Sequence, residues 1–157
     1  MKRFCFLLIA LLLLLPSCGR RADELSLAKA TDMVLTEYGD NASFVRADGD
    51  FITTNFGNRE DVAESAVYFS ESGDGTEFGF FRMSDAAHCG DMESDVRAYI
   101  ASERQSVESL AALYPADDLN ARLKRFDNAT VGTVGNIVYY FITEPTIAKN
   151  AVRRFRG

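Results

Sequence analysis

Two pairs of strand-type segments constrain the fold of this 157-residue chain more than any other feature. The first pair is residues 66–70 (AVYFS) and Glu77–Met83 (EFGFFRM), joined by the turn-rich letters ESGDGTE. The second pair is residues 129–131 and 136–143, with Gly135 supplying the turn. β-Branched and aromatic residues favour strands, and short glycine-containing connections favour antiparallel hairpins. Alternation along the Glu77–Met83 strand places Phe78, Phe80 and Arg82 on one face and Phe81 and Met83 on the other.

Segments with helical periodicity separate and flank these hairpins. Apolar residues recur every three or four positions in residues 25–38, 92–114 and 116–126 and in a last segment after Thr143, which predicts amphipathic helices. The longest of them carries a stripe formed by Val96, Ile100, Val107, Leu110 and Tyr114. Thr143 is expected to cap the last helix, with Pro145 in its first turn. Short helical turns are expected at residues 51–56 and from Asn58, and a short extended piece at Phe44 and Val45.

The order of these elements predicts the architecture. Helix, hairpin, long helix, hairpin and helix give an α+β fold in which the two hairpins join into one antiparallel sheet. We expect a two-layer sandwich, with the helices packed on one face of that sheet. Residues 25–157 are long enough for one domain of this kind.

The N-terminal residues have a different character. Lys2 and Arg3 precede an apolar run over residues 4–15, and this run is shorter than the roughly 20 residues that a membrane-spanning helix needs. A basic start, a short apolar run and a small residue at its end are typical of a secretory signal peptide, here residues 1–17. The alternative is a buried core helix, which a uniformly apolar run at the chain start disfavours.

The run closes on Leu15, Pro16, Ser17 and Cys18, which resembles the lipobox of bacterial lipoproteins. Pro16 departs from the usual small residue of that motif, whereas the other three positions match it. The resemblance implies cleavage before Cys18 and a diacylglyceryl group on its thiol, with residues 18–24 as a short tether. Two acyl chains anchor a protein stably, so the expected location is the extracytoplasmic side of the cell membrane. The alternative is an ordinary signal peptide that happens to precede a cysteine.

The charge and cysteine content argue against nucleic-acid binding, an internal disulfide and a catalytic Cys–His pair. The full chain has a net charge of −6, and removal of Lys2 and Arg3 from its 17 basic residues leaves 15 against 23 acidic residues, a net charge of −8. Nonspecific phosphate binding needs a basic surface, so nucleic acid is not an expected partner. With Cys5 removed and Cys18 acylated, only Cys89 remains, and the domain has no internal disulfide. Cys89 adjoins His88, but neighbouring residues point in different directions, which argues against a catalytic pair.

No motif for a nucleophile elbow, a phosphate-binding loop, a dinucleotide site or a zinc site is present. Acidic residues are the remaining candidates for metal binding, and we interpret them instead as turn and helix-start residues. We therefore expect no catalytic residue, no metal and no cofactor. The acidic clusters are Asp48 and Asp50; Glu71, Asp74 and Glu77; and Asp91, Glu93 and Asp95.

Several segments together resemble one family. The letters LPSCG, EDVAESAVYFS, EFGFFRM and VGTVGNIVYYFIT, with the long helix before LYP, are similar to small lipoproteins of Gram-positive bacteria grouped as domain-of-unknown-function family 4358. This resemblance covers most of the chain after Cys18. It implies a location and a fold, and it brings no activity and no catalytic residues.

Three functional hypotheses follow. The first is a non-enzymatic lipoprotein that acts as a binding or accessory module of the cell envelope, with membrane lipid bound through acylated Cys18 and an envelope protein as a candidate partner. The second is a small hydrolase or lyase that uses carboxylates from distant segments. A solute-capture protein is disfavoured because such proteins usually have two lobes around a cleft.

Overall fold

The computed structural model describes residues 25–156, so the predicted signal peptide and the tether around Cys18 lie outside the described residues. The described strands are β1 (Phe44–Arg46), β2 (Val62–Ser70), β3 (Glu77–Met83), β4 (Thr130–Val134) and β5 (Ile137–Ile142). The helices are α2 (Leu27–Tyr38), α3 (Gly49–Phe56), α4 (Cys89–Leu113), α5 (Asp117–Asp127) and α6 (Pro145–Arg156), with a 3₁₀ turn, η2, at Ala86–His88.

The five strands form one antiparallel sheet in the order β1-β2-β3-β5-β4. The β2–β3 and β4–β5 hairpins join through β3 and β5, with Phe80 opposite Tyr139 and Phe78 opposite Phe141. The α+β class and the sheet built from two hairpins are therefore confirmed. The expected extended piece at Phe44 becomes an edge strand, β1, that pairs with β2.

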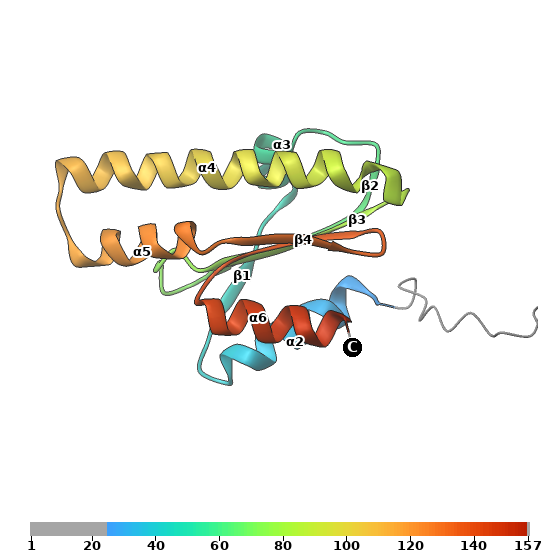
Figure 1. Ribbon diagram of the computed structural model, residues 1–157, viewed down its shortest axis with the longest axis horizontal. Helices are drawn as coiled ribbons and strands as arrows, with labels where there is room; N and C mark the ends of the chain where they lie inside the picture. Colours follow the sequence, from blue (N-terminus) through green and yellow to red (C-terminus); the bar gives the residue numbers. More distant parts are fainter. Residues whose placement is uncertain (1–24, 157) are drawn as a thin grey trace, which may run out of the picture.

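The helices cover both faces of the sheet, which corrects the expected two-layer arrangement. Helices α3 and α4 lie over one face, and α2 and α6 lie over the other (Figure 1). The predicted alternation in β3 is confirmed, since Phe78 and Phe80 belong to one apolar cluster and Phe81 and Met83 to the other. Every residue of β5 is buried. Because these central strands are apolar on both faces, a helical layer is needed on each side.

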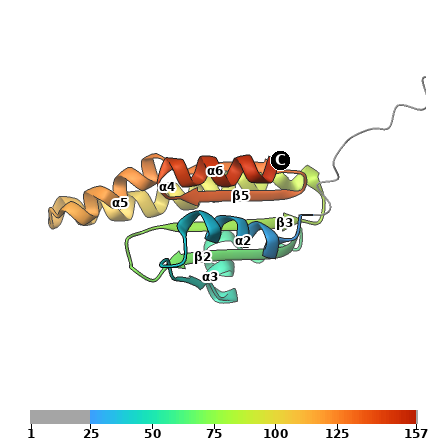
Figure 2. The same cartoon turned by 90° about the horizontal axis from the view of Figure 1, so that it is seen from below.

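Helices α2 and α6 run side by side beneath the sheet, as Figure 2 shows from below. Ala148 and Ala151 face the sheet with little side-chain bulk, which lets α6 lie close to it. Thr143 does not cap α6 as predicted. Its side chain is buried and accepts a hydrogen bond from the Tyr38 hydroxyl at 2.6 Å, which ties the end of α2 to the start of α6.

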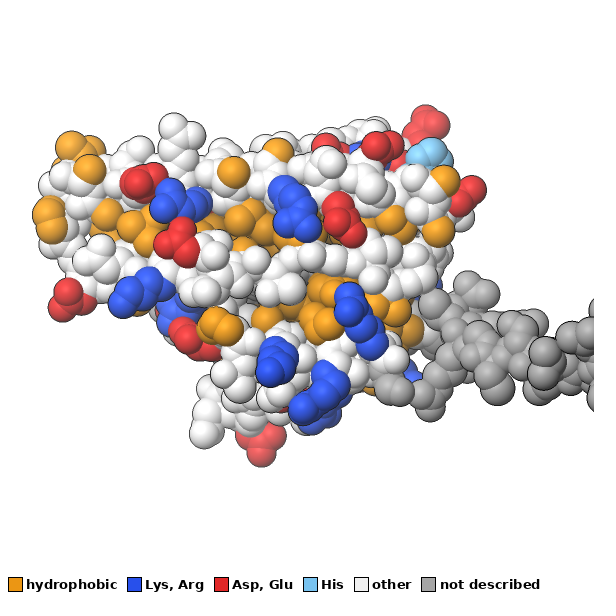
Figure 3. Space-filling model, viewed as in Figure 1, with side chains coloured by type: hydrophobic (Ala, Val, Ile, Leu, Met, Phe, Trp, Pro, Cys, Tyr) orange, Lys and Arg blue, Asp and Glu red, His pale blue; other side chains and the backbone are white. Residues whose placement is uncertain are grey.

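Helix α4 extends past the end of the sheet and pairs there with α5 (Figure 1). The stripe predicted for α4 is buried at Val96, Ile100 and Val107. Beyond the sheet α4 packs only against α5, and there the stripe is largely uncovered: Leu110 is 47% exposed and Tyr114 is 69% exposed. Figure 3 shows hydrophobic side chains on the surface at this end of the molecule.

The segment after α3 also differs from its prediction. Instead of a helical turn from Asn58, the chain makes a short loop and enters β2 at Val62. Arg59 holds this loop by ion pairs with Asp61 and with Asp95 on α4. The aspartates keep the pKa of Arg59 above its usual value, chiefly through the hydrogen bonds that Arg59 donates to the Asp61 carboxylate. The Arg59–Asp95 ion pair links this loop to α4, and local periodicity does not report such pairs.

A candidate binding pocket beside Glu77

The turn between β2 and β3 forms one wall of a pocket of about 360 Å³, and helices α3, α4 and α5 form the others. The pocket combines aromatic rings with charged side chains of both signs. The residues that line it are Phe51, Asn55, Phe69, Ser70, Gly73, Gly75, Thr76, Glu77, Tyr99, Glu103, Arg122 and Phe126.

Glu77 is the most unusual side chain of this pocket. It is the first residue of β3 and only 6% exposed. Its carboxylate accepts a hydrogen bond from the Tyr99 hydroxyl on α4 at 2.9 Å and another from the Tyr140 hydroxyl on β5. A buried carboxylate needs such donors, because water cannot solvate it. Glu77 is therefore held between the sheet and the long helix.

Burial raises the pKa of Glu77 to about 7. The two tyrosine hydrogen bonds favour the charged form and oppose this rise, whereas the negative charge of Glu103 adds to it. The pKa values of Tyr99 and Tyr140 are also raised, mainly by burial and then by the charge of Glu77. Near neutral pH the Glu77 carboxyl is thus poised between its two protonation states.

Arg122 on α5 supplies the positive charge of the pocket. Its side chain lies against Gly75, where an added Cβ atom would stand 2.8 Å from the guanidinium Nε. Gly75 has a φ of 80°, so the turn and the close approach both require glycine there. Within residues 25–156, Arg122 has no carboxylate within ion-pair distance, and its buried Nε has no hydrogen-bond partner. Its charge is available to a ligand.

Aromatic side chains enclose the apolar part of the pocket. Phe51 on α3 meets Phe69 on β2 edge to face at 4.8 Å between ring centroids, and it meets Tyr99 at 6.0 Å. Phe126 on α5 lines the same hollow and is buried. Edge-to-face rings pack tightly and hold their positions, so this wall is preformed.

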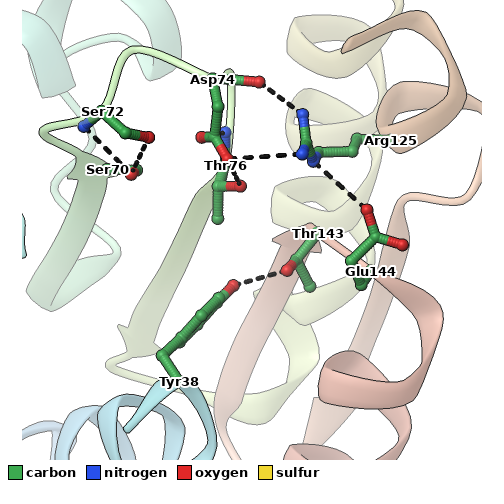
Figure 4. A network of polar contacts seen from close by, with 8 residues as sticks. All are labelled: Tyr38, Ser70, Ser72, Asp74, Thr76, Arg125, Thr143 and Glu144. Carbon is green, nitrogen blue, oxygen red and sulfur yellow. Dashed lines mark hydrogen bonds and ion pairs between the residues drawn. The ribbon is translucent and has the colours of Figure 1, made fainter. Parts of the chain in front are cut away.

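A polar network next to the pocket fixes the β2–β3 turn (Figure 4). Arg125 on α5 donates to the Asp74 backbone oxygen at 2.7 Å and forms ion pairs with the carboxylates of Asp74 and Glu144. Asp74 accepts hydrogen bonds from the backbone N–H and the hydroxyl of Thr76. One arginine thereby joins the turn, α5 and the start of α6, and it keeps the pocket wall in place.

The predicted anchor, Cys18, lies outside the described residues. The structure does describe Cys89 and His88, and it does not bring them together. The Cys89 thiol is buried and lies 4.0 Å from the Gly135 carbonyl oxygen, and burial raises its pKa. The His88 Nδ1 atom instead lies 3.9 Å from the Asp61 carboxylate.

The acidic clusters have structural roles, and the Asp91 cluster lies at a helix start as expected, whereas Asp48 and Asp50 begin a helix where a turn was expected. Asp48 caps α3 by accepting from the Phe51 N–H at 2.8 Å, and Asp91 lies in the first turn of α4. Across residues 25–156, no three His, Cys, Asp or Glu side chains gather in a way that could hold a metal ion. The interpretation of Glu77 as a turn residue is wrong, because Glu77 begins β3 and its side chain is buried.

The sequence pattern does not predict the pocket, although it contains one signal for Glu77. The two-residue alternation that places Phe81 and Met83 on one face of β3 also places Glu77 on that face. A carboxylate on a core-facing position predicts buried partners. Nothing in the local sequence identified Tyr99, Tyr140 or Arg122 as those neighbours, because they lie 22 or more residues away.

The chain was compared with family models, curated proteins and solved structures, and none of the three comparisons found a match. The resemblance to family 4358 therefore stays a hypothesis. No helix in the part of the chain that the structure describes has the length and apolar character needed to cross a bilayer.

Proposed function

We propose that this protein is a non-enzymatic binding module of the cell envelope, anchored through acylated Cys18 to the extracytoplasmic side of the cell membrane. The observation that carries the binding role is the pocket in which Glu77, Glu103 and Arg122 share a preformed aromatic wall. Small-molecule sites are typically concave and apolar, with a few polar groups that fix the ligand's orientation.

The charges of the pocket indicate the class of ligand. Arg122 suits a carboxylate or another small anion, because a guanidinium presents several donors to one planar group. Glu103, together with ionised Glu77, suits a positively charged group, which the neighbouring aromatic faces also favour. A small zwitterion, such as an amino acid or the end of a short peptide, satisfies both. The bound ligand would also supply the missing partner of Arg122.

Titration calorimetry of the purified protein against amino acids and short peptides tests this proposal. We expect saturable binding by at least one of them. Arg122→Gln and Glu103→Gln should each weaken it about tenfold or more, since each leaves one ligand charge unpaired. Lys124→Gln and Glu60→Gln are matched controls, because both side chains are exposed and line no part of this pocket. Equal binding by Arg122→Gln and the wild-type protein would reject this site.

A second candidate function is a carboxylate-dependent hydrolase or lyase. Glu77 favours it, because a carboxyl with a pKa of about 7 beside a second carboxylate is suited to general acid–base work. Turnover of envelope peptides or glycans that is lost in both Glu77→Gln and Glu103→Gln would favour this candidate. Binding without turnover would favour the binding module.

A further inference from the structure

We propose that the outer face of the α2–α6 layer rests on anionic membrane lipid, with the acidic α3–α4–α5 side turned away from the bilayer. This inference rests on the proposed anchor at Cys18. The α2–α6 face is defined by four exposed basic residues that have no carboxylate partner within residues 25–156: Lys29, Lys149, Arg153 and Arg156. Arg156 also donates to the Tyr139 hydroxyl on β5 at 3.4 Å.

Helix α6 carries the main part of this charge. It has four basic residues and no acidic one, in a chain whose net charge is −6. Lys149, Arg153 and Arg156 follow one another at spacings of four and three, which places them along one side of the helix. Cations in a last turn complement the helix dipole, but Lys149 precedes that turn and this effect does not explain it. Arg154 is neutralised by an ion pair with Glu37 at 2.6 Å.

The two helical layers differ in the sign of their charge. Helices α2 and α6 hold five basic and two acidic residues, whereas α3, α4 and α5 hold five basic and nine acidic ones. Packed layers lie roughly 10 Å apart, so about 20 Å separates the helical layers, more than the Debye length of about 8 Å at physiological salt. An anionic surface therefore attracts one face of the domain without an equal repulsion from the other. Figure 3 shows Lys and Arg side chains gathered over α6.

The position of the tether matches this face. The start of α2 and the C-terminal turn of α6 lie at the same end of the molecule in both ribbon views (Figures 1 and 2), and Leu25 precedes α2 by two residues. Cys18 precedes Leu25 by seven residues, and seven residues span at most roughly 25 Å when fully extended. An anchor at Cys18 would keep the basic residues near the lipid headgroups. A basic patch next to a lipid chain is a common pairing of membrane signals.

The test is a proximity measurement on the protein purified from membranes and reconstituted in vesicles of phosphatidylcholine with or without phosphatidylglycerol. Thr146→Cys on α6 and Ser106→Cys on α4, each in a Cys89→Ala background, place one fluorescent label on either side of the molecule. Thr146 shares the side of Lys149 and Arg153 and leaves their charges intact. Quenching by a spin-labelled lipid then reports which side is near the bilayer.

We expect stronger quenching at position 146 than at position 106 in vesicles that contain phosphatidylglycerol, and a much smaller difference without it. Lys149→Gln with Arg153→Gln should abolish the difference. Arg97→Gln with Lys124→Gln, which removes the same charge from the acidic side, should preserve it. Equal quenching at both positions, or stronger quenching at position 106, would overturn the proposal.

Mass spectrometry of the same preparation tests the anchor separately. If Cys18 carries no lipid, the anchor proposal fails, and the basic face is then tested by co-sedimentation with the same vesicles at low ionic strength, where surface charge is screened least. Binding that needs phosphatidylglycerol and falls about tenfold or more in the Lys149 and Arg153 double variant would still support the proposal that the α2–α6 face binds anionic lipid. Absence of such binding would overturn it.

Discussion

At the residue scale, the buried Glu77 carboxyl makes the stability of the domain depend on pH. Its pKa is about 7 in the folded state and near 4.5 when the chain is unfolded, so between these values only the folded state holds the proton. The contribution of Glu77 to stability is therefore fully present below about pH 4.5 and is lost as pH rises to about 7. Glu77→Gln removes this titration and keeps the size of the side chain.

We expect the free energy of unfolding of the wild-type protein to fall relative to that of Glu77→Gln by up to about 3 kcal/mol over that pH window. Urea unfolding of both proteins at about pH 5 and about pH 8 measures the change. Glu60→Gln, at an exposed carboxylate, is the control. Because this variant keeps Glu77, the difference in unfolding free energy between it and the wild-type protein should change little between the two pH values. A constant difference between wild type and Glu77→Gln would mean that Glu77 titrates alike in both states.

A second prediction at this scale concerns Gly79 in β3. An added Cβ atom would lie 2.3 Å from a ring carbon of Tyr140 and 2.9 Å from a methyl carbon of Val67, and both neighbours are fully buried. Tyr140 cannot turn aside without losing its hydrogen bond to Glu77. Gly79→Ala should therefore destabilise the protein by about 3 kcal/mol, at the upper end of typical overpacking effects.

Thermal and urea unfolding of Gly79→Ala measure this loss. Gly90→Ala is the matched control, because nothing lies within 4 Å of its Cβ position and it stands in the first turn of α4. Alanine favours helix over glycine, so Gly90→Ala should be neutral or stabilising by up to about 1 kcal/mol. Similar losses in both variants would contradict the packing argument.

At the element scale, Arg125 joins α5 to the β2–β3 turn and to the start of α6 (Figure 4). Its side chain is 18% exposed, so its removal leaves polar groups of Asp74 without their partner in a half-buried place. Arg125→Gln should destabilise the domain by about 1–3 kcal/mol and speed amide hydrogen exchange in residues 71–76. Lys124→Gln, the preceding position on the same helix, should leave exchange in this turn unchanged.

The predicted elements show what local pattern can and cannot identify. The bounds of β3 were predicted without error, because its alternating apolar residues report both a strand and two buried faces. The start of β2 at Val62 and the role of Thr143 were missed, because each involves a partner distant in sequence, Met83 on β3 in one case and Tyr38 in the other. Periodicity reports burial along one element, whereas partners across elements need the tertiary structure.

At the scale of the whole molecule, the number of layers was the main feature that the sequence left open. Apolar residues on both faces of β3 require a helical layer on each side of the sheet, whereas the order of the elements alone is equally compatible with one layer. The candidate pocket was beyond prediction for a related reason. Its charged residues come from β3, α4 and α5, and only the packing of α4 and α5 against the sheet brings them together.

The last prediction concerns the attachment of the whole domain. If Cys18 is acylated, Cys18→Ala removes the only bond between the domain and the two acyl chains, and the precursor loses the residue that the lipoprotein pathway modifies. The basic α2–α6 face alone is too weak to hold a protein durably on a bilayer at physiological salt, because surface charge is screened within about 8 Å.

We therefore expect Cys18→Ala either to leave the membrane fraction when salt is raised or to accumulate as uncleaved precursor. Fractionation in low and high salt, followed by intact-mass analysis, distinguishes these two results. Cys89→Ala is the matched control, because Cys89 is buried in the domain and should not affect attachment. Processed Cys18→Ala protein that stays on membranes in high salt would show that the attachment has another source.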